Sequence, residues 1–240
     1  MTSFVDVEPD GTFLPEDKHT ISDGGDPNVF GGVLHAVALS RADKPVVNIT
    51  TRFVQLARPF VPISSSVRKA DTHDIVTLYQ NDDVISISTL LTSDKPISNV
   101  GDVEPLPPKQ FREREWDWGW GSGSDLLAYM TGYFRRDRSM MWLKDHEMDL
   151  AAVATLCDFG TINLVPLVGQ FGRTMMLTSH FTGVLPECSS QVTHQIRAQS
   201  RGSLITQLDQ YTEDGRPVCL TTMTAKVRQL DTGWKGGTFS

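Results

Sequence analysis

The sequence predicts an α+β fold built from two similar units, each with one helix enclosed by a long antiparallel sheet. The main observation is that the order of elements repeats, because a helical segment is followed by four strand-like segments in each half. Composition supports this prediction, since 39% of the 240 residues are hydrophobic and 21% are charged, enough for a substantial core. An apolar helix is readily buried by a sheet wrapped round it, and two such sheets could join edge to edge.

The first half opens with the predicted helix. Asp26 is the expected helix cap and Pro27 the first helical residue, with apolar residues at helical spacing over 33–38. Alternating segments then predict four strands, within 46–59, 63–71, 74–80 and 84–91. The NDD sequence before the last of them is typical of a turn.

The second half repeats this order. Its helix is expected over 145–159, with Asp145 as the cap and Gly160 as the stop. Strands are expected within 173–186, 190–199, 203–211 and 216–230, with the turn TEDG before the last. The segments 111–134 and 135–143 are expected to supply the opening strands of this half.

A stretch rich in Pro, Gly and Asp separates the halves and predicts a linker. We therefore expect an N-terminal unit over 1–95, a linker over 96–112 and a C-terminal unit over 113–240. The sequence WDWGWGSGSD in the second half favours a mobile aromatic loop, and a lid or the wall of an acyl pocket is the alternative.

Bulk properties exclude several classes of function. With a net charge of −7 and no long basic run, the chain is not expected to bind nucleic acid. Cys157, Cys188 and Cys219 are far apart and odd in number, which argues against a disulfide framework or a zinc site and favours reduced thiols in the cytoplasm. No apolar run approaches the roughly 20 residues that span a bilayer, and the N-terminus lacks signal-peptide features, so no membrane association is expected.

Three short motifs resemble the type II acyl-CoA thioesterases. These are Phe30-Gly31-Gly32 at the start of the first helix, Arg58-Pro59 at the end of a strand, and Gln80-Asn81 before an alternating strand. In the second half, the sequences MMWLKD, LCDFGTINLVPL and YTEDGRPVCLTTMTAKVRQ resemble segments of the same family. The resemblance covers roughly residues 25–230 and implies a double-hotdog fold, with an acyl thioester of CoA or acyl carrier protein as substrate.

The resemblance also implies a set of site residues. The family combines an Asp on the second helix, a Thr on the following strand and a Gln on the last strand. Asp158 matches the first role, and Thr178 is the candidate for the second, with a solvent-facing threonine ladder as the alternative. The last strand has Met223 or Thr224 near the position of the Gln, so Gln207 on the preceding strand is the candidate substitute, and an exposed strand amide is the alternative for it.

Asp158 also attracts attention from the residues alone, because it ends an apolar helical run just before a glycine. Leu156 and Phe159 beside it would raise its pKa, which suits a general base or nucleophile for thioester hydrolysis. The alternative is an ordinary carboxylate that caps the following turn. Strict alternation predicts that Thr178 shares one strand face with a polar set comprising Thr174, Met176, His180 and Thr182.

Three residues of the first helix are candidates for substrate binding. Gly31 and Gly32 would allow close approach to the helix backbone, either by substrate or simply by a packed neighbour. His35 is either a partner in the site or a hydrogen-bonded core histidine.

The predicted function is hydrolysis of an acyl thioester by water activated at Asp158, with no metal or redox cofactor. The alternatives are a hotdog dehydratase or cyclase that acts on a polyketide-like intermediate, and a non-catalytic acyl-binding protein. A homo-oligomer is compatible with the sequence, which does not determine the number of copies.

Overall fold

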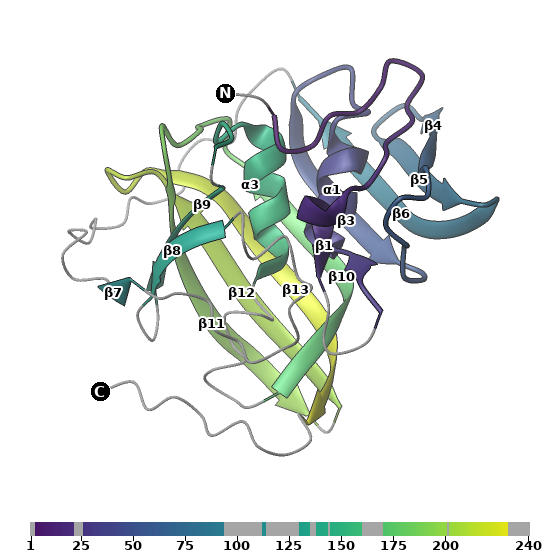
Figure 1. Ribbon diagram of the computed structural model, residues 1–240. Coiled ribbons are helices and arrows are strands. Elements are labelled where there is room, and N and C mark those ends of the chain that lie inside the picture. The colour runs from purple at the N-terminus through teal and green to yellow at the C-terminus, as the bar shows by residue number, and fades with distance from the viewer. Residues whose placement is uncertain are drawn as a thin grey trace.

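A computed structural model describes residues 3–21, 26–93, 112–113, 130–134, 138–143, 145–159, 170–200 and 202–229. In this part of the chain, two helices lie against one strongly curved antiparallel sheet (Figure 1). The predicted linker over 96–112 falls almost entirely outside the described residues, and so does the aromatic loop over 116–125.

The N-terminal half contains one α-helix and most of the shorter strands. Its elements are η1 (Asp17–His19), β1 (Thr20–Ile21), β2 (Asn28–Val29), α1 (Gly31–Leu39), β3 (Val46–Phe53), β4 (Ser64–Lys69), β5 (Asp74–Gln80) and β6 (Asp83–Thr92). The four strands after α1 confirm the predicted order, although the first ends at Phe53 and not near Pro59.

The C-terminal half confirms the repeat and carries the longer strands. Its elements are β7 (Arg112–Glu113), β8 (Met130–Phe134), β9 (Arg138–Leu143), α3 (Leu150–Leu156), the 3-10 turn η3 (Cys157–Phe159), β10 (Gln170–Phe181), β11 (Ser190–Ser200), β12 (Ser203–Tyr211) and β13 (Pro217–Gln229). Strands β7 to β9 lie where the opening strands of this half were expected.

The two halves share one sheet, as the pattern predicted. Among the described residues the strand order is β4-β5-β6-β3-β10-β13-β12-β11-β9-β8-β7, so the halves meet where β3 pairs antiparallel with β10. Thr50 lies opposite Thr178 across this seam, and their hydroxyl oxygens are 3.1 Å apart. The side-chain amide of Asn48 donates to the Ser179 carbonyl at 3.2 Å. Pairing at the seam removes two strand edges that would otherwise be exposed.

Both predicted helix caps are wrong, for different reasons. The segment after Asp26 pairs with β1 as strand β2, so α1 begins four residues later than Pro27, at Gly31, and no side chain caps it. Asp145 has a φ of +63° and lies outside α3. The cap of α3 is Asp149, whose carboxylate accepts a hydrogen bond from the Ala152 amide at 2.8 Å. The predicted stop, Gly160, lies outside the described residues.

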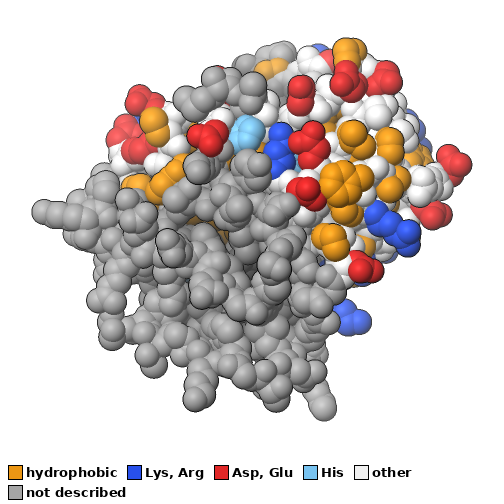
Figure 2. Space-filling model, viewed as in Figure 1, with side chains coloured by type: hydrophobic (Ala, Val, Ile, Leu, Met, Phe, Trp, Pro, Cys, Tyr) orange, Lys and Arg blue, Asp and Glu red, His pale blue; other side chains and the backbone are white. Residues whose placement is uncertain are grey.

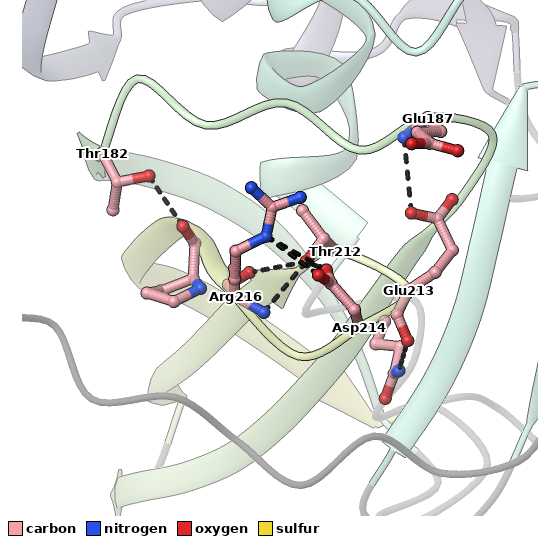
Figure 3. A network of polar contacts seen from close by, with 8 residues as sticks. Thr182, Glu187, Thr212, Glu213, Asp214 and Arg216 are labelled. Atoms are coloured by element: carbon pink, nitrogen blue, oxygen red, sulfur yellow. Dashed lines mark hydrogen bonds and ion pairs between the residues drawn. The ribbon is translucent and has the colours of Figure 1, made fainter.

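Both predicted turns are confirmed. Asn81 and Asp82 take positive φ values of 52° and 68° between β5 and β6, as a tight two-residue hairpin requires. Between β12 and β13, the Thr212 amide donates to the Arg216 carbonyl at 2.8 Å, in the polar network of Figure 3. The Glu213 carboxylate from this turn accepts the amide of Cys188 at 2.8 Å, which ties the turn to the segment between β10 and β11.

On the described part of the face in Figure 2, hydrophobic side chains lie among acidic and basic ones. Neither of the two described α-helices has the length and apolar character needed to cross a membrane.

Candidate functional site

Asp158 lies in the η3 turn that continues α3, and it is buried, with 3% of its surface exposed. The turn brings its carboxylate to the start of α1, in the other half of the molecule. A Cβ atom added to Gly31 would lie 2.5 Å from Asp158 Oδ2 and 3.2 Å from Phe53 Cζ. The carboxylate therefore lies close against the helix start and near the end of an aromatic ring.

Within the described ranges, two groups donate hydrogen bonds to this carboxylate. The Thr174 hydroxyl on β10 donates to Asp158 Oδ1 at 2.5 Å, and the backbone N–H of Gly32 donates to the same carboxyl group. Burial raises the pKa of Asp158 to about 7, although both hydrogen bonds act in the opposite direction. The raised pKa that the apolar neighbours predicted is thus confirmed.

The start of α1 is available to Asp158 because no side chain of the described residues caps it. The cap residue, Phe30, has no side-chain acceptor, so the amide of Gly32 is free to donate across to the carboxylate. The rings of Phe30 and Phe159 lie 4.7 Å apart between centroids and hold the η3 turn against this helix end. Helix start and carboxylate are therefore fixed relative to each other by apolar contact as well as by hydrogen bonding.

Both glycines also have a packing role. A Cβ on Gly32 would overlap the backbone carbonyl oxygen of Thr155, so this glycine allows α1 to lie directly against α3. At Gly31, the Asp158 carboxylate occupies the space that a side chain would need. This favours the packing interpretation of both residues, and their contact with substrate stays a prediction.

The structure places Thr174, and not Thr178, beside Asp158. A β-bulge in β10 between Thr174 and Met176 shifts the pairing register with β13. Thr174 therefore turns inward together with Leu177 and Ser179, whereas strict alternation had grouped it with Thr178. Thr178 is instead half-buried and contacts Thr50 at the seam.

The bulge left a weak signal in the sequence. In the run Thr174-Met175-Met176-Leu177, three apolar residues in a row break the alternation that the rest of the strand follows. That break is the mark of an extra residue in the strand, and it could have identified Thr174 as an inward-facing residue.

Gln207 does not reach Asp158 either. It is half-buried on β12, where its side-chain oxygen accepts a hydrogen bond from Arg197 Nε at 2.8 Å and its amide donates to Asp209. Its neighbours Thr206 and Leu208 are the residues that point inward. The side chain closest to Thr174 from β13 is Met223, whose sulfur lies 3.3 Å from the Thr174 hydroxyl.

His35 is a hydrogen-bonded core histidine. It is fully buried, with Nδ1 2.8 Å from the Thr51 hydroxyl on β3 and Nε2 3.1 Å from the Ser179 hydroxyl on β10. Burial lowers its pKa to about 3, so the ring is neutral in the folded protein. Because the two ring nitrogens contact one strand on each side of the seam, the structure favours a role in joining the halves over a role in contacting substrate.

The chain matches no protein-family model and no curated protein sequence, but many solved structures resemble it. A candidate thioesterase from Novosphingobium aromaticivorans superposes with a TM-score of 0.80 at 18% identity, over 92% of this chain and 98% of that one. A hot dog fold protein from Alicyclobacillus acidocaldarius superposes with a TM-score of 0.74 at 16% identity, over 91% of this chain and 93% of that one. The acyl-CoA thioesterase II TesB2 from Mycobacterium marinum superposes with a TM-score of 0.64 at 12% identity, over 95% of this chain and 96% of that one.

The fold is a double hotdog. The likeness extends over both halves of the chain and confirms the fold that the sequence motifs implied. Other proteins with this likeness are a pyran synthase domain of the sorangicin pathway and a dehydratase domain of the Mycobacterium tuberculosis polyketide protein PpsC, with TM-scores of 0.60 and 0.58 at 10% identity each.

Within the double hotdog, the candidate site is shared by the two units. Asp158 and Thr174 come from the C-terminal half, and Gly31 and Gly32 from the N-terminal half. The arrangement offers a carboxylate that can accept a proton near neutral pH, a hydroxyl that orients it, and backbone amides at a helix start. Among the described residues, no three His, Cys, Asp or Glu side chains are grouped to hold a metal ion.

Proposed function

We propose that this protein hydrolyses acyl thioesters carried on CoA or on an acyl carrier protein, with Asp158 activating the attacking water. The observation that carries the proposal is the environment of Asp158: a buried carboxyl with a pKa of about 7, held between the Thr174 hydroxyl and the Gly32 amide. A base whose pKa lies close to neutral combines a useful ionised fraction with a real affinity for the proton.

In the proposed reaction, ionised Asp158 takes a proton from water as the water oxygen bonds to the thioester carbonyl carbon. The carbonyl oxygen becomes an oxyanion, for which we assign the backbone N–H of Gly31 at the uncapped start of α1 as a donor. Asp158 is neutral in this intermediate, the form that its buried surroundings favour. Collapse of the intermediate breaks the carbon–sulfur bond, and the leaving thiolate takes up the proton from Asp158, which restores the carboxylate.

Thr174 has a positioning role in this proposal. Its hydroxyl holds one carboxylate oxygen of Asp158, which aims the other toward the helix start, where Oδ2 lies close to Gly31. The Met223 sulfur contacts the same hydroxyl at 3.3 Å.

The decisive experiment measures free thiol released from a panel of acyl-CoA substrates. We expect Asp158→Asn to lower kcat by at least about a hundredfold, because a removed general base typically costs that much. Asp209→Asn is the matched control, since Asp209 is another buried carboxyl whose pKa is raised by burial but lies on β12 away from Thr174. A folded Asp158→Asn protein with wild-type turnover would contradict the assignment.

A dehydratase or cyclase is the second candidate, favoured by the double-hotdog dehydratase and pyran synthase domains. Mass spectrometry of products separates the candidates, because hydrolysis yields a free acid and a free thiol, whereas dehydration or cyclisation leaves the thioester intact. Tight acyl-CoA binding without any product would favour the non-catalytic alternative. We also propose that the protein acts in the cytoplasm and that it self-associates.

A further inference from the structure

Two thiols face each other beneath the turn that carries Asp158. Cys157 Sγ in η3 and Cys219 Sγ on β13 lie 3.6 Å apart, and both residues are completely buried. They are free thiols, as is the third cysteine, Cys188, which is exposed. The proposed hydrolysis uses neither member of the pair.

The surroundings of the pair are polar on one side. The side-chain amide of Gln210 donates to Cys157 Sγ at 3.2 Å, and the Thr221 hydroxyl lies 3.5 Å from Cys219 Sγ. Burial raises the pKa of both thiols, but the hydrogen-bonding groups around Cys157 outweigh it and hold the pKa of that thiol below its ordinary value. The Gln210 amide that donates to Cys157 Sγ would stabilise a thiolate there, which favours Cys157 as the nucleophile of the pair.

We propose that Cys157 and Cys219 form an oxidisable dithiol, which hydroperoxides convert to a reversible disulfide directly before the candidate base. In the first step the Cys157 sulfur attacks the O–O bond, which forms a sulfenic acid and releases an alcohol or water. In the second step the Cys219 sulfur attacks the sulfenic sulfur, so that an S–S bond forms, the S–O bond breaks and water leaves. Two thiols and one hydroperoxide thus give one disulfide, one alcohol or water molecule, and one further water.

The short distance between the two sulfur atoms favours a disulfide over further oxidation of either thiol to a sulfinic acid. The two sulfur atoms are already in contact, so each needs to move by less than about 1 Å to reach the ordinary S–S distance of about 2 Å. The disulfide would tie the η3 turn to β13 and close a loop of about 60 residues, which restricts the unfolded chain. Because the turn also carries Asp158, the redox state of the pair would control how firmly the carboxyl group is held.

The test uses Cys188→Ser protein, which removes the exposed thiol and leaves the buried pair. After treatment with hydrogen peroxide, the protein is unfolded and alkylated. We expect a mass lower by about 2 Da with no alkyl label, and two labels after reduction with dithiothreitol. Peptide mapping should place the cross-link between Cys157 and Cys219, and the oxidised protein should melt roughly 5 °C or more above the reduced one.

The matched control is the double variant Cys188→Ser, Cys219→Ala, which leaves Cys157 without a partner. Its peroxide product should be a sulfenic or sulfinic acid and should melt no higher than the untreated variant. Two thiols that stay open to alkylation in oxidised Cys188→Ser protein, or two separate sulfinic acids without a cross-link, would overturn the proposal. These readings are made by mass and melting temperature, so they do not depend on thioester hydrolysis.

Discussion

At the residue scale, the surroundings of Asp158 oppose its ionisation in one way and support it in another. Burial raises its pKa, while the Thr174 hydroxyl and the Gly32 amide keep the ionised form accessible. The sequence allowed this carboxyl group to be predicted, because an acidic residue at the end of an apolar helix is conspicuous. It did not reveal the two donors, since they come from segments more than ten residues away in the chain.

The raised pKa of Asp158 has a consequence for stability. Because the folded pKa is about 7 against an ordinary value of 3.8, folding favours the neutral form. The contribution of this group to stability is therefore complete below about pH 4 and is lost as the pH rises through 7. Asp158→Asn should remove this loss, so its free energy of unfolding relative to wild type should increase between pH 5 and pH 8, by about 2–3 kcal/mol.

Urea unfolding of both proteins at the two pH values measures this difference. Asp83→Asn, at an exposed position in β6, is the control and should follow the wild-type pH dependence. A stability difference between Asp158→Asn and wild type that stays constant from pH 5 to pH 8 would show that the carboxyl group is not neutral in the folded state.

The two threonines of β10 provide a second comparison at this scale. Thr174→Val removes the hydroxyl that orients Asp158, and we expect kcat to fall about tenfold to a hundredfold while the fold is retained. Thr178→Val, on the same strand, alters a contact with Thr50 at the seam and should leave kcat within about twofold. Thiol-release kinetics on both variants measure these changes in kcat. Equal losses of kcat in the two variants would contradict the positioning role of Thr174.

At the scale of elements, the site depends on the close approach of α1 and α3. Apolar residues at helical spacing predicted both helices, but their start points were wrong because capping depends on tertiary partners. Asp26 was predicted to cap the first helix, but the residues after it pair with β1 as strand β2. The helix starts instead at Gly31, where no side chain caps it and the backbone amides can face Asp158. The bulge in β10 is a similar case, because one extra residue reverses the face of every residue on one side of it.

Substitutions at the two adjacent glycines should therefore have different effects. Gly32→Ala places a methyl group on the Thr155 backbone carbonyl, which cannot move without separating the helices, so we expect a loss of about 1–3 kcal/mol in stability. Gly31→Ala meets only the end of the Asp158 side chain and the Phe53 ring, which can shift. We expect it to cost less than about 1 kcal/mol but to lower kcat by tenfold or more, because it displaces the carboxylate.

Urea unfolding combined with thiol-release kinetics separates the two effects. A Gly32→Ala protein as stable as the wild type would contradict the close contact between Gly32 and the Thr155 carbonyl. A Gly31→Ala enzyme with unchanged kcat would mean that the position of Asp158 matters less than proposed.

At the scale of the whole molecule, the two halves are joined by contacts that do not involve the linker. Strand β3 pairs with β10, His35 bridges Thr51 and Ser179 across that seam, and α1 packs on α3 (Figure 1). The repeat in the sequence predicted the duplication and the joined sheet, because alternation with a period of two is visible locally. The strands that meet at the seam could not be predicted, since β3 and β10 are more than a hundred residues apart and alternate like their neighbours.

The proposed units, 1–95 and 113–240, should therefore stay together when the linker between them is cut. A protease site inserted within 96–112 and then cleaved should give two fragments that co-elute on gel filtration and unfold in one transition. Separation would expose the paired edges of β3 and β10 together with the apolar faces of both helices, which costs far more than the loss of one covalent connection. Introducing His35→Phe into the cleaved protein removes the hydrogen bond between His35 and Ser179 across the seam and should lower the urea concentration at which the fragments dissociate. If the cleaved fragments separate in buffer without denaturant, the linker and not the seam holds the double hotdog together, and a site shared between the units would then depend on an intact chain.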